Sequence, residues 1–374
     1  MKMVVLGLSL SSSWGNGHAT TYRALLKALA HRGHEILFLE RDVSWYAVHR
    51  DLLKPDYCCL RFYQEPADLR HYTREIETAE IVIIGSFVPD GIEIADWALP
   101  LARGMTAFYD IDTPATFSAI RDGTCAYLAA RQIPKFDLYL SFTGGPLLRQ
   151  IEQTFAARAA RALYCAVDTE ICRPLELDPL WDIGYLGTYS ADRQPALEKF
   201  LIEPALRSPD KSFVVAGAQY PETVLWPSNV HRIDHIAPDG LPEFFAKIRW
   251  ALNITRSEMI DAGFSPSVRL FEAAACGAPI ISDRWRGLEK LFSVGEEIIL
   301  ADDTTDVLAA LSLPETRRLA IAAAARTQIL SAHSAEHRAA ELETIIAEIR
   351  TVKLHSANID RELAAWNRSA AIRL

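Results

Sequence analysis

The chain has 374 residues, half of them hydrophobic, and a net charge of −9 at neutral pH. A single hydrophobic core rarely exceeds about 250 to 300 residues, so this length predicts two domains. The negative charge argues against a nucleic-acid partner, because binding to phosphates needs clustered lysines and arginines. The longest apolar runs, such as residues 81–84, are far shorter than the roughly 20 residues that cross a bilayer. We therefore expect a cytoplasmic enzyme with no transmembrane segment.

The first half of the chain alternates between apolar strands and amphipathic helices. A strand at residues 4–8 leads through a glycine-containing loop into a helix whose apolar side chains recur with helical spacing at Tyr22, Leu25, Leu26 and Leu29. Further strands are expected at residues 36–39, 81–84, 106–109 and 138–142. The alternation predicts a parallel sheet joined by crossover helices. Residues 45–72 are rich in aromatic side chains, show no clear period and are left unassigned.

The second half repeats this alternation, with strands expected at residues 183–186, 213–216, 230–233, 250–254 and 280–282. Beyond residue 313 the chain is alanine-rich and predicted to be helical. Two parallel sheets in one chain predict two Rossmann-like domains. Ligands of such sheets bind beyond the carboxyl ends of the strands, so we expect a site in the cleft between the domains.

Residues 263–281 predict a loop, a helix and a strand. Ser265 is a suitable N-cap, Pro266 suits the first helical position, and Gly277 suits the left-handed residue that ends a helix. The free amides at Ser267 and Val268 would then meet the positive end of the helix dipole. Such a helix start can bind an anion, although most capped helices in α/β proteins bind nothing.

Two charged residues follow on the same predicted helix face. Arg269 adds a positive charge beside the anion site, and Glu272 follows it by three residues. An anion site with a carboxylate one turn further along is what a nucleoside diphosphate and its ribose require. The alternative is that Glu272 and Arg269 form an ordinary surface ion pair.

The same segment resembles the donor-binding segment of GT-B glycosyltransferases, in which a Glu precedes small residues, a Gly, a Pro and a strand. Residues 252–256 and 281–283 on either side resemble the CgeB-like branch of these enzymes, and residues 165–174 resemble their interdomain hinge. The resemblance implies a GT-B architecture, with two Rossmann-like domains facing a cleft. It implies an acceptor domain at residues 1–166, a nucleotide-sugar donor domain at 167–350, and a C-terminal helix at 351–374 that returns to the first domain.

The resemblance also implies roles for individual residues. Glu272 would hold the ribose, and His235 lies in the segment that holds the base. The donor diphosphate would be bound by Thr188, Arg193, Arg256, Ser265, Ser267, Val268 and Arg269. On the acceptor side, Gly17 belongs to a loop facing the cleft, and the candidate catalytic residues are His18, Asp110 and Asp112. The expected reaction transfers a sugar from a nucleotide-diphosphate sugar to a glycan, lipid, protein or small molecule, with no metal and no other cofactor.

Several of these residues have other interpretations. The glycines around residue 16 do not form a dinucleotide fingerprint, because Thr20 occupies the third glycine position. His18 could instead be a solvated residue at a helix start. Asp110 and Asp112 match D-x-D, a metal-binding pattern of another glycosyltransferase fold, but they could also cap the turn that follows. Arg193 and Arg256 could form surface ion pairs.

Residues 333–337 match the zinc pattern H-x-x-E-H through His333 and His337. A pattern of only five residues is often matched by chance, and the alanine-rich surroundings favour an ordinary exposed helix. We therefore expect no metal site there.

One position departs from the GT-B pattern. Retaining enzymes of this fold carry an acidic residue eight positions before the ribose-binding Glu, where this chain has Phe264. Glu258 and Asp261 lie upstream at a spacing that does not match. The departure leaves the stereochemistry open and is the main support for one alternative, a catalytically inactive binding module. A sugar-nucleotide 2-epimerase or a sugar phosphorylase could also use the same fold.

Overall fold

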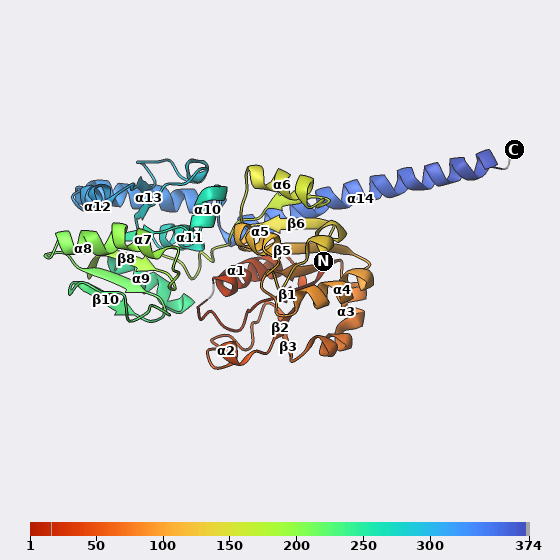
Figure 1. Cartoon of the computed structure of the whole chain (residues 1–374), viewed down its shortest axis with the longest axis horizontal. Coiled ribbons are helices and arrows are strands. Elements are labelled where there is room, and N and C mark those ends of the chain that lie inside the picture. Colours follow the sequence, from red (N-terminus) through yellow and green to blue (C-terminus); the bar gives the residue numbers. More distant parts are fainter. Residues whose placement is uncertain (16, 372–374) are drawn as a thin grey trace.

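The computed structural model describes the backbone of residues 1–15 and 17–371 and the side chains of residues 1–15 and 17–353. Two parallel β-sheets lie in separate lobes, each accompanied by its own helices (Figure 1). Residues 2–162 supply the strands of the first sheet and residues 181–300 those of the second. The predicted α/β fold with two Rossmann-like units is confirmed.

The first sheet has seven strands in the order β3-β2-β1-β4-β5-β6-β7. They are β1 (Lys2–Gly7), β2 (Glu35–Arg41), β3 (Cys59–Tyr63), β4 (Ile81–Gly85), β5 (Met105–Asp110), β6 (Leu138–Ser141) and β7 (Ala160–Ala162). Every residue of β4 is buried, as expected for a strand whose sheet is covered on both faces. Met3 and Val5 of β1 pack with α1 (His18–His31), whereas Val4 and Leu6 pack on the other face with α4 (Gly91–Leu101).

Helix α1 ends before Gly33, which takes up a positive φ of 83° directly after its last turn. The other helices of the first lobe are α2 (Ser44–Ala47), η1 (Pro66–Tyr72), α3 (Thr73–Thr78), α5 (Thr113–Arg121), η2 (Ala130–Lys135) and α6 (Pro146–Thr154). The previously unassigned residues 45–72 therefore contain most of α2, all of β3 and all of η1.

The second sheet has six strands in the order β10-β9-β8-β11-β12-β13. They are β8 (Trp181–Leu186), β9 (Phe213–Ala216), β10 (Val230–Ile233), β11 (Ile248–Asn253), β12 (Ile280–Ser282) and β13 (Ile299–Leu300). Its helices are α7 (Gln194–Leu197), η3 (Glu198–Ile202), α8 (Glu203–Arg207), η4 (Pro238–Gly240), α9 (Leu241–Ala246), α10 (Ser257–Ala262), α11 (Val268–Ala275), η5 (Leu288–Lys290), α12 (Thr304–Leu311) and α13 (Glu315–Ala332). Strand β11 pairs with β8 on one side and β12 on the other, so its carboxyl end lies at the middle of the sheet edge.

The chain crosses between the lobes twice, and the two crossings touch. Val167 pairs with Ser334, and the Ala335 amide donates to the Val167 carbonyl at 2.9 Å. Lys27 of α1 binds Asp168 at 2.9 Å and Glu170 at 2.7 Å. These contacts hold the first crossing at the predicted hinge.

Helix α14 (Ala335–Ala371) runs back from the second lobe along the first (Figure 1). Glu343 accepts from His34 at 2.7 Å, and Lys353 binds Asp137 at 2.9 Å. The returning helix was predicted at residues 351–374, but it begins earlier, at Ala335. Residues 372–374 lie outside the described part of the chain. Among the described residues, no helix is both long enough and apolar enough to span a membrane.

Candidate functional site

A cleft of about 530 Å³ lies between the carboxyl ends of the two sheets. This volume is in the range of small-molecule sites. Every predicted site residue except Asp110 lines it: Gly17, His18 and Asp112 from the first lobe, and Thr188, Arg193, His235, Arg256, Ser265, Ser267, Val268, Arg269 and Glu272 from the second. Residues that come from both halves of the chain thus meet at one surface.

The start of α11 differs from the prediction. The helix begins at Val268, so Ser267 is the N-cap residue, and Pro266 precedes the helix. The Ser265 hydroxyl instead pairs at 2.8 Å with Thr143 of the first lobe. Gly277, with φ of 78°, follows the last turn as predicted. The N-terminal end of α11 still points into the cleft, because Ser267 and Val268 both line it.

Asn253, the last residue of β11, fixes the start of α11. Its side-chain oxygen accepts from the Ser267 hydroxyl at 2.7 Å and from Arg269 Nη1 at 2.9 Å. Its amide nitrogen donates to Ser282 of β12 at 2.9 Å. Asn253 was not among the predicted site residues; the available signal was a polar residue at the end of an apolar strand.

Arg269 is more buried than the prediction assumed. Its Nε donates to the Leu186 carbonyl, and its guanidinium lies 4.8 Å from the centre of the Tyr185 ring. The side chain lines the cleft from behind the loop that follows β8. Its charge therefore adds to the positive field of the site while its position is held by the protein.

Glu272 is 4% exposed and faces the cleft. Burial raises the pKa of its carboxyl to about 7, and the charge of Arg269 opposes that rise. No hydrogen bond or ion pair joins its carboxylate to another described residue, so the surface ion pair with Arg269 is absent. A buried carboxylate without a donor is costly, and hydroxyl groups of a ligand would supply what it lacks.

The loop after β8 brings Thr188 and Arg193 to the cleft. Arg193 Nη2 donates to the Thr188 carbonyl at 2.6 Å, while its Nε is buried without a partner. Gly187 touches the loop after β9, where a side chain on Gly217 would lie 2.0 Å from the Gly187 carbonyl oxygen. Glycine at 217 thus allows the two loops to approach closely.

His18 begins α1 and lies beside the cleft, where its ring is buried and not solvated. Its Nδ1 has no hydrogen-bond partner, and its ring meets Phe87 edge-on at 5.4 Å. Burial lowers the pKa of His18; the charge of Asp112 raises it and that of Arg256 lowers it. The imidazole is therefore neutral at pH 7 and able to accept a proton.

Asp112 and Arg256 face each other from opposite lobes, with Oδ2 and Nη1 3.8 Å apart. Both line the cleft and both are partly exposed. An exposed pair at this distance contributes little to stability. Both side chains remain available to a ligand.

Asp110 does not face the cleft, contrary to the prediction. It ends β5 inside the first lobe and is fully buried. Its carboxylate accepts from Tyr139, from Thr116 at 2.8 Å and from the Asp112 amide at 3.3 Å. Burial raises its pKa to about 6, while the bonds from Tyr139 and Thr116 oppose the rise. Its surroundings are those of a structural carboxylate that joins β5, β6 and α5.

Phe264 occupies the contact between the lobes. It has a positive φ of 51°, its amide donates to Arg286 and its carbonyl accepts from Gly144 at 2.9 Å. Its ring fills the space that side chains on Gly145 and Gly287 would need. An aromatic residue rarely takes up this backbone conformation, so the contacts on both sides hold it in place. The residue does not line the cleft.

The potential metal motifs do not converge. Among the described residues, no group of three or more His, Cys, Asp and Glu side chains could hold a metal ion. In the H-x-x-E-H segment, His333 Nδ1 contacts Arg338, and His337 Nδ1 pairs with Ser334 at 2.8 Å.

His235 lines the cleft, and burial lowers the pKa of its ring.

Comparison with known proteins agrees with this architecture. A family model described as glycosyl transferase-like matches residues 193–344. No curated protein sequence matches the chain. The sucrose-phosphate synthase from Thermosynechococcus elongatus superposes with a TM-score of 0.68 at 13% identity, covering 94% of this chain and 100% of that one. The chain has the GT-B fold.

Two further GT-B structures are similar over the same length. HepE from Anabaena, solved with UDP-glucose, has a TM-score of 0.66 at 12% identity and covers 93% of this chain and 100% of its own. An alpha-glucosyltransferase bound to UDP-glucose and DNA has a TM-score of 0.69 at 13% identity, covering 93% of this chain and 99% of that one.

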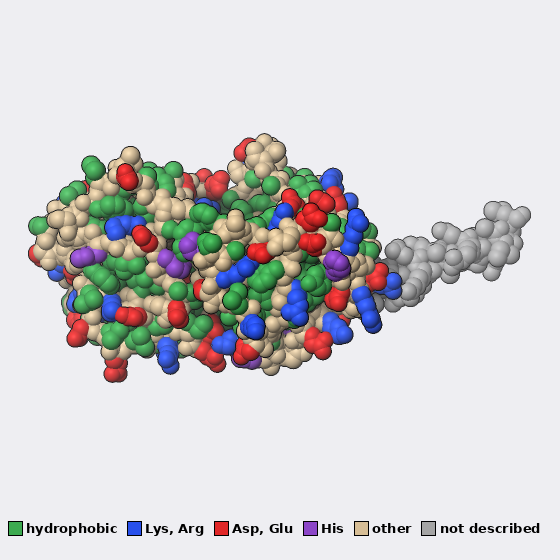
Figure 2. Space-filling view, turned by 90° about the horizontal axis from the view of Figure 1, so that it is seen from below, with side chains coloured by type: hydrophobic (Ala, Val, Ile, Leu, Met, Phe, Trp, Pro, Cys, Tyr) green, Lys and Arg blue, Asp and Glu red, His purple; other side chains and the backbone are tan. Residues whose placement is uncertain are grey.

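Figure 2 shows acidic and basic side chains interspersed on one face of this GT-B chain. The expectation of no nucleic-acid partner stays a prediction.

Proposed function

We propose that the chain is a glycosyltransferase that moves a sugar from a nucleoside-diphosphate sugar to an acceptor in the cleft. The observation that carries the proposal is the buried, unpartnered carboxylate of Glu272 in the same cavity as the start of α11. The match of residues 193–344 to the glycosyl transferase-like family model supports it. So does the UDP-glucose bound by HepE and by the alpha-glucosyltransferase, which share this fold.

In this proposal the second lobe binds the donor. Glu272 accepts hydrogen bonds from the ribose hydroxyls, and the loop carrying His235 lies next to the base. The diphosphate contacts the α11 amides, Thr188 and the arginines at 193, 256 and 269. Departure of the nucleoside diphosphate develops negative charge, which these fixed donors and positive charges stabilise.

The first lobe supplies the acceptor side. The acceptor hydroxyl attacks the anomeric carbon of the donor, the bond from that carbon to the diphosphate oxygen breaks, and the hydroxyl proton needs a base. His18 is neutral, buried and without a partner on Nδ1. It therefore takes the proton, while Asp112 accepts a hydrogen bond from the acceptor. Asp110 has no part in this step, because its carboxylate is enclosed in the first lobe.

We further propose that the chain belongs to the CgeB-like branch, that it transfers a hexose or a related sugar, and that it needs no divalent metal. The helix start and three arginines at the cleft provide the positive field that a metal provides elsewhere. The proposed domains are the acceptor unit, the donor unit and a returning helix that begins at Ala335.

The direct test is a screen of UDP, GDP, ADP and TDP sugars for thermal stabilisation of the full chain. A ligand at about 100 times its dissociation constant adds about 2.7 kcal/mol to the stability of the folded state. We expect one nucleoside diphosphate to raise the melting temperature, and its sugar to be transferred to an acceptor or slowly to water. No stabilisation by any of these compounds would contradict the proposal.

The same incubation separates the alternatives. A 2-epimerase would convert the sugar nucleotide alone into its epimer, and a phosphorylase would require inorganic phosphate or a sugar phosphate. An inactive binding module would bind the nucleotide without turnover. Phe264 is compatible with activity because its ring fills the contact between the lobes and leaves the cleft open.

A further inference from the structure

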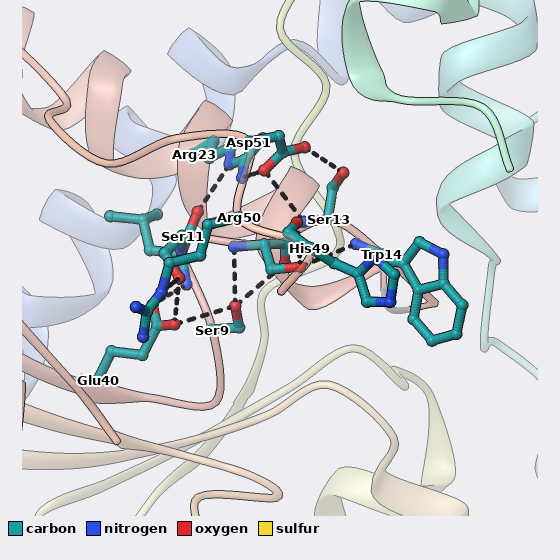
Figure 3. Close-up of polar contacts among 11 residues, drawn as sticks. Ser9, Ser11, Ser13, Trp14, Arg23, Glu40, His49, Arg50 and Asp51 are labelled. Atoms are coloured by element: carbon teal, nitrogen blue, oxygen red, sulfur yellow. Dashed lines mark hydrogen bonds and ion pairs between the residues drawn. The ribbon is translucent and has the colours of Figure 1, made fainter. Parts of the chain in front are cut away.

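The loop after β1 is held by a buried carboxylate. Glu40, fully buried at the end of β2, accepts from the amides of Leu10 at 2.6 Å and Ser11 at 2.9 Å, and from the Ser9 hydroxyl at 3.3 Å (Figure 3). Bonds to a charged acceptor are stronger than neutral ones. The loop that precedes α1 is therefore fixed to β2.

A second set of contacts joins this loop to residues 49–51. The Ser12 hydroxyl donates to the His49 carbonyl at 2.9 Å, and Asp51 accepts from Ser13 and Arg23. Figure 3 shows these polar contacts between Glu40 at one end and Trp14 at the other. Two segments distant in sequence thus form one fixed surface.

Aromatic rings cover the outer end of this surface. The rings of Trp14 and His49 stack at 4.3 Å with an angle of 8°, and Trp45 meets Trp14 edge-on at 4.8 Å. Trp45 is 52% exposed. We call Trp14, Trp45 and His49 the aromatic platform. It is preorganised, because the polar contacts behind it already hold both segments.

The aromatic platform adjoins the cleft. Ser13, Gly15 and Tyr46, from the same two segments, line the cleft on the first-lobe side. Across from them is His235 of the second lobe, on which the charges of Asp51 and His49 act. A molecule extending from the proposed reaction centre towards the first lobe would therefore meet the aromatic platform.

We propose that the aromatic platform binds a sugar ring of a saccharide acceptor. This inference rests on the proposed function. One face of a pyranose carries C–H groups, which pack against the negative face of an aromatic ring, while its hydroxyls point sideways to polar partners. Ser13 and Asp112 supply such partners in the adjoining cleft.

A membrane surface fits the observations less well. Val48 and Leu53 are 76% and 60% exposed near the aromatic platform and could contact lipid. However, the nearby arginines at 23 and 50 are paired with Asp51 and Asp42. The region therefore offers little net positive charge to anionic headgroups.

The test uses the full chain saturated with the nucleoside diphosphate it binds. An array of neutral oligosaccharides is probed first, and the best-bound oligosaccharide is then titrated. We expect Trp14→Ala and Trp45→Ala each to weaken saccharide binding about tenfold, with Trp45→Phe retaining most of it. The matched controls Val48→Ala and Leu53→Ala remove exposed apolar side chains outside the aromatic platform and should leave binding unchanged. If Trp14→Ala does not fold, the half-exposed Trp45 still provides the comparison.

The outcomes distinguish this inference from the proposed function. The inference is overturned if nucleoside diphosphate affinity is normal but no oligosaccharide on the array binds. It is also overturned if saccharide binding is unchanged in Trp14→Ala and Trp45→Ala. Binding to phosphatidylcholine and phosphatidylglycerol vesicles that is lost in Val48→Ala and Leu53→Ala overturns it in favour of a membrane. A chain that binds no nucleoside diphosphate contradicts the proposed function instead.

Discussion

Asp110, at the end of β5, and Glu272, in α11, are two buried carboxyl groups, one in each lobe. Burial raises the pKa of both, to about 6 for Asp110 and about 7 for Glu272. Their partners differ. Asp110 accepts from two hydroxyls and one amide, whereas Glu272 has no hydrogen bond or ion pair with any described residue and faces the cleft.

The comparison shows that burial and a raised pKa do not by themselves mark a binding residue. A buried carboxylate whose hydrogen bonds are made within the protein stabilises the fold. A buried carboxylate that lacks such hydrogen bonds can still accept them from a ligand, and ligand binding then recovers part of the free-energy cost of its desolvation.

Asp110→Asn should lower the free energy of unfolding by about 3 kcal/mol. The NH2 group of the asparagine would face a hydroxyl group that donates to the carboxylate in the wild type, so one hydrogen bond would be lost. Urea denaturation measures the change. Asp112→Asn is the matched control, because its side chain is partly exposed and its contact with Arg256 is long, so its effect should stay below about 1 kcal/mol. Equal effects at both positions would remove the structural role assigned to Asp110.

Glu272→Gln should weaken nucleoside diphosphate binding roughly tenfold to a hundredfold, since hydrogen bonds to a charged acceptor contribute about 1.5 to 3 kcal/mol. Asp at this position is too short to reach the ribose and should be nearly as damaging. Calorimetric titration measures the affinity, and a melting curve checks that the variant folds. The control Glu258→Gln removes the same charge from an exposed position of the same lobe and should change affinity less than about twofold. Unchanged affinity in folded Glu272→Gln would remove the main support for the donor site.

Nucleoside diphosphate affinity should rise with pH through the pKa of Glu272. The free carboxyl is mostly protonated below about pH 7, and only the ionised form accepts strong hydrogen bonds from both ribose hydroxyls. Between pH 6 and 8 the ionised fraction rises about tenfold, and affinity should follow. The affinities of wild type and Glu272→Gln are both measured across this range. Ionisation of the ligand's phosphate affects both proteins equally, so the ratio of the two affinities reports the ionisation of the Glu272 carboxyl alone. A ratio independent of pH would contradict the assignment.

The smallest expected effect is that of metal removal. Sugar transfer should proceed at an unchanged rate after EDTA treatment, because arginines and helix amides supply the positive field. Activity that is lost with EDTA and returns with manganese would contradict metal independence and would make Asp112 a candidate ligand. Zinc bound stoichiometrically to the purified protein would redirect attention to His333 and His337.

Much of the fold was predictable from the sequence because buried parallel strands are continuous apolar runs and their helices have a regular period. The predicted strands at residues 213–216, 230–233 and 280–282 match β9, β10 and β12 residue for residue. Strands β3, β7 and β13 were not predicted. All three are edge strands and only partly buried, so none contains a long continuous apolar run.

The sequence predicted the loop, helix and strand around Glu272, because glycines, prolines and apolar runs act locally. The resemblance to GT-B glycosyltransferases implied the other site positions, all of which except Asp110 line the cleft. Only the tertiary structure decided which carboxylate faces the ligand. Side chains two residues apart share a face of an extended strand, but β5 ends at Asp110 and the chain turns at Asp112 into α5, so Asp110 lies in the core and Asp112 at the cleft. Likewise, Ser265 is not the N-cap of α11 but forms a hydrogen bond with Thr143 of the other lobe. The ring of Phe264 fills a space between Gly145 and Gly287, which are distant in sequence. The first outcome depends on contacts within the folded first lobe, and the other two on contacts between the lobes.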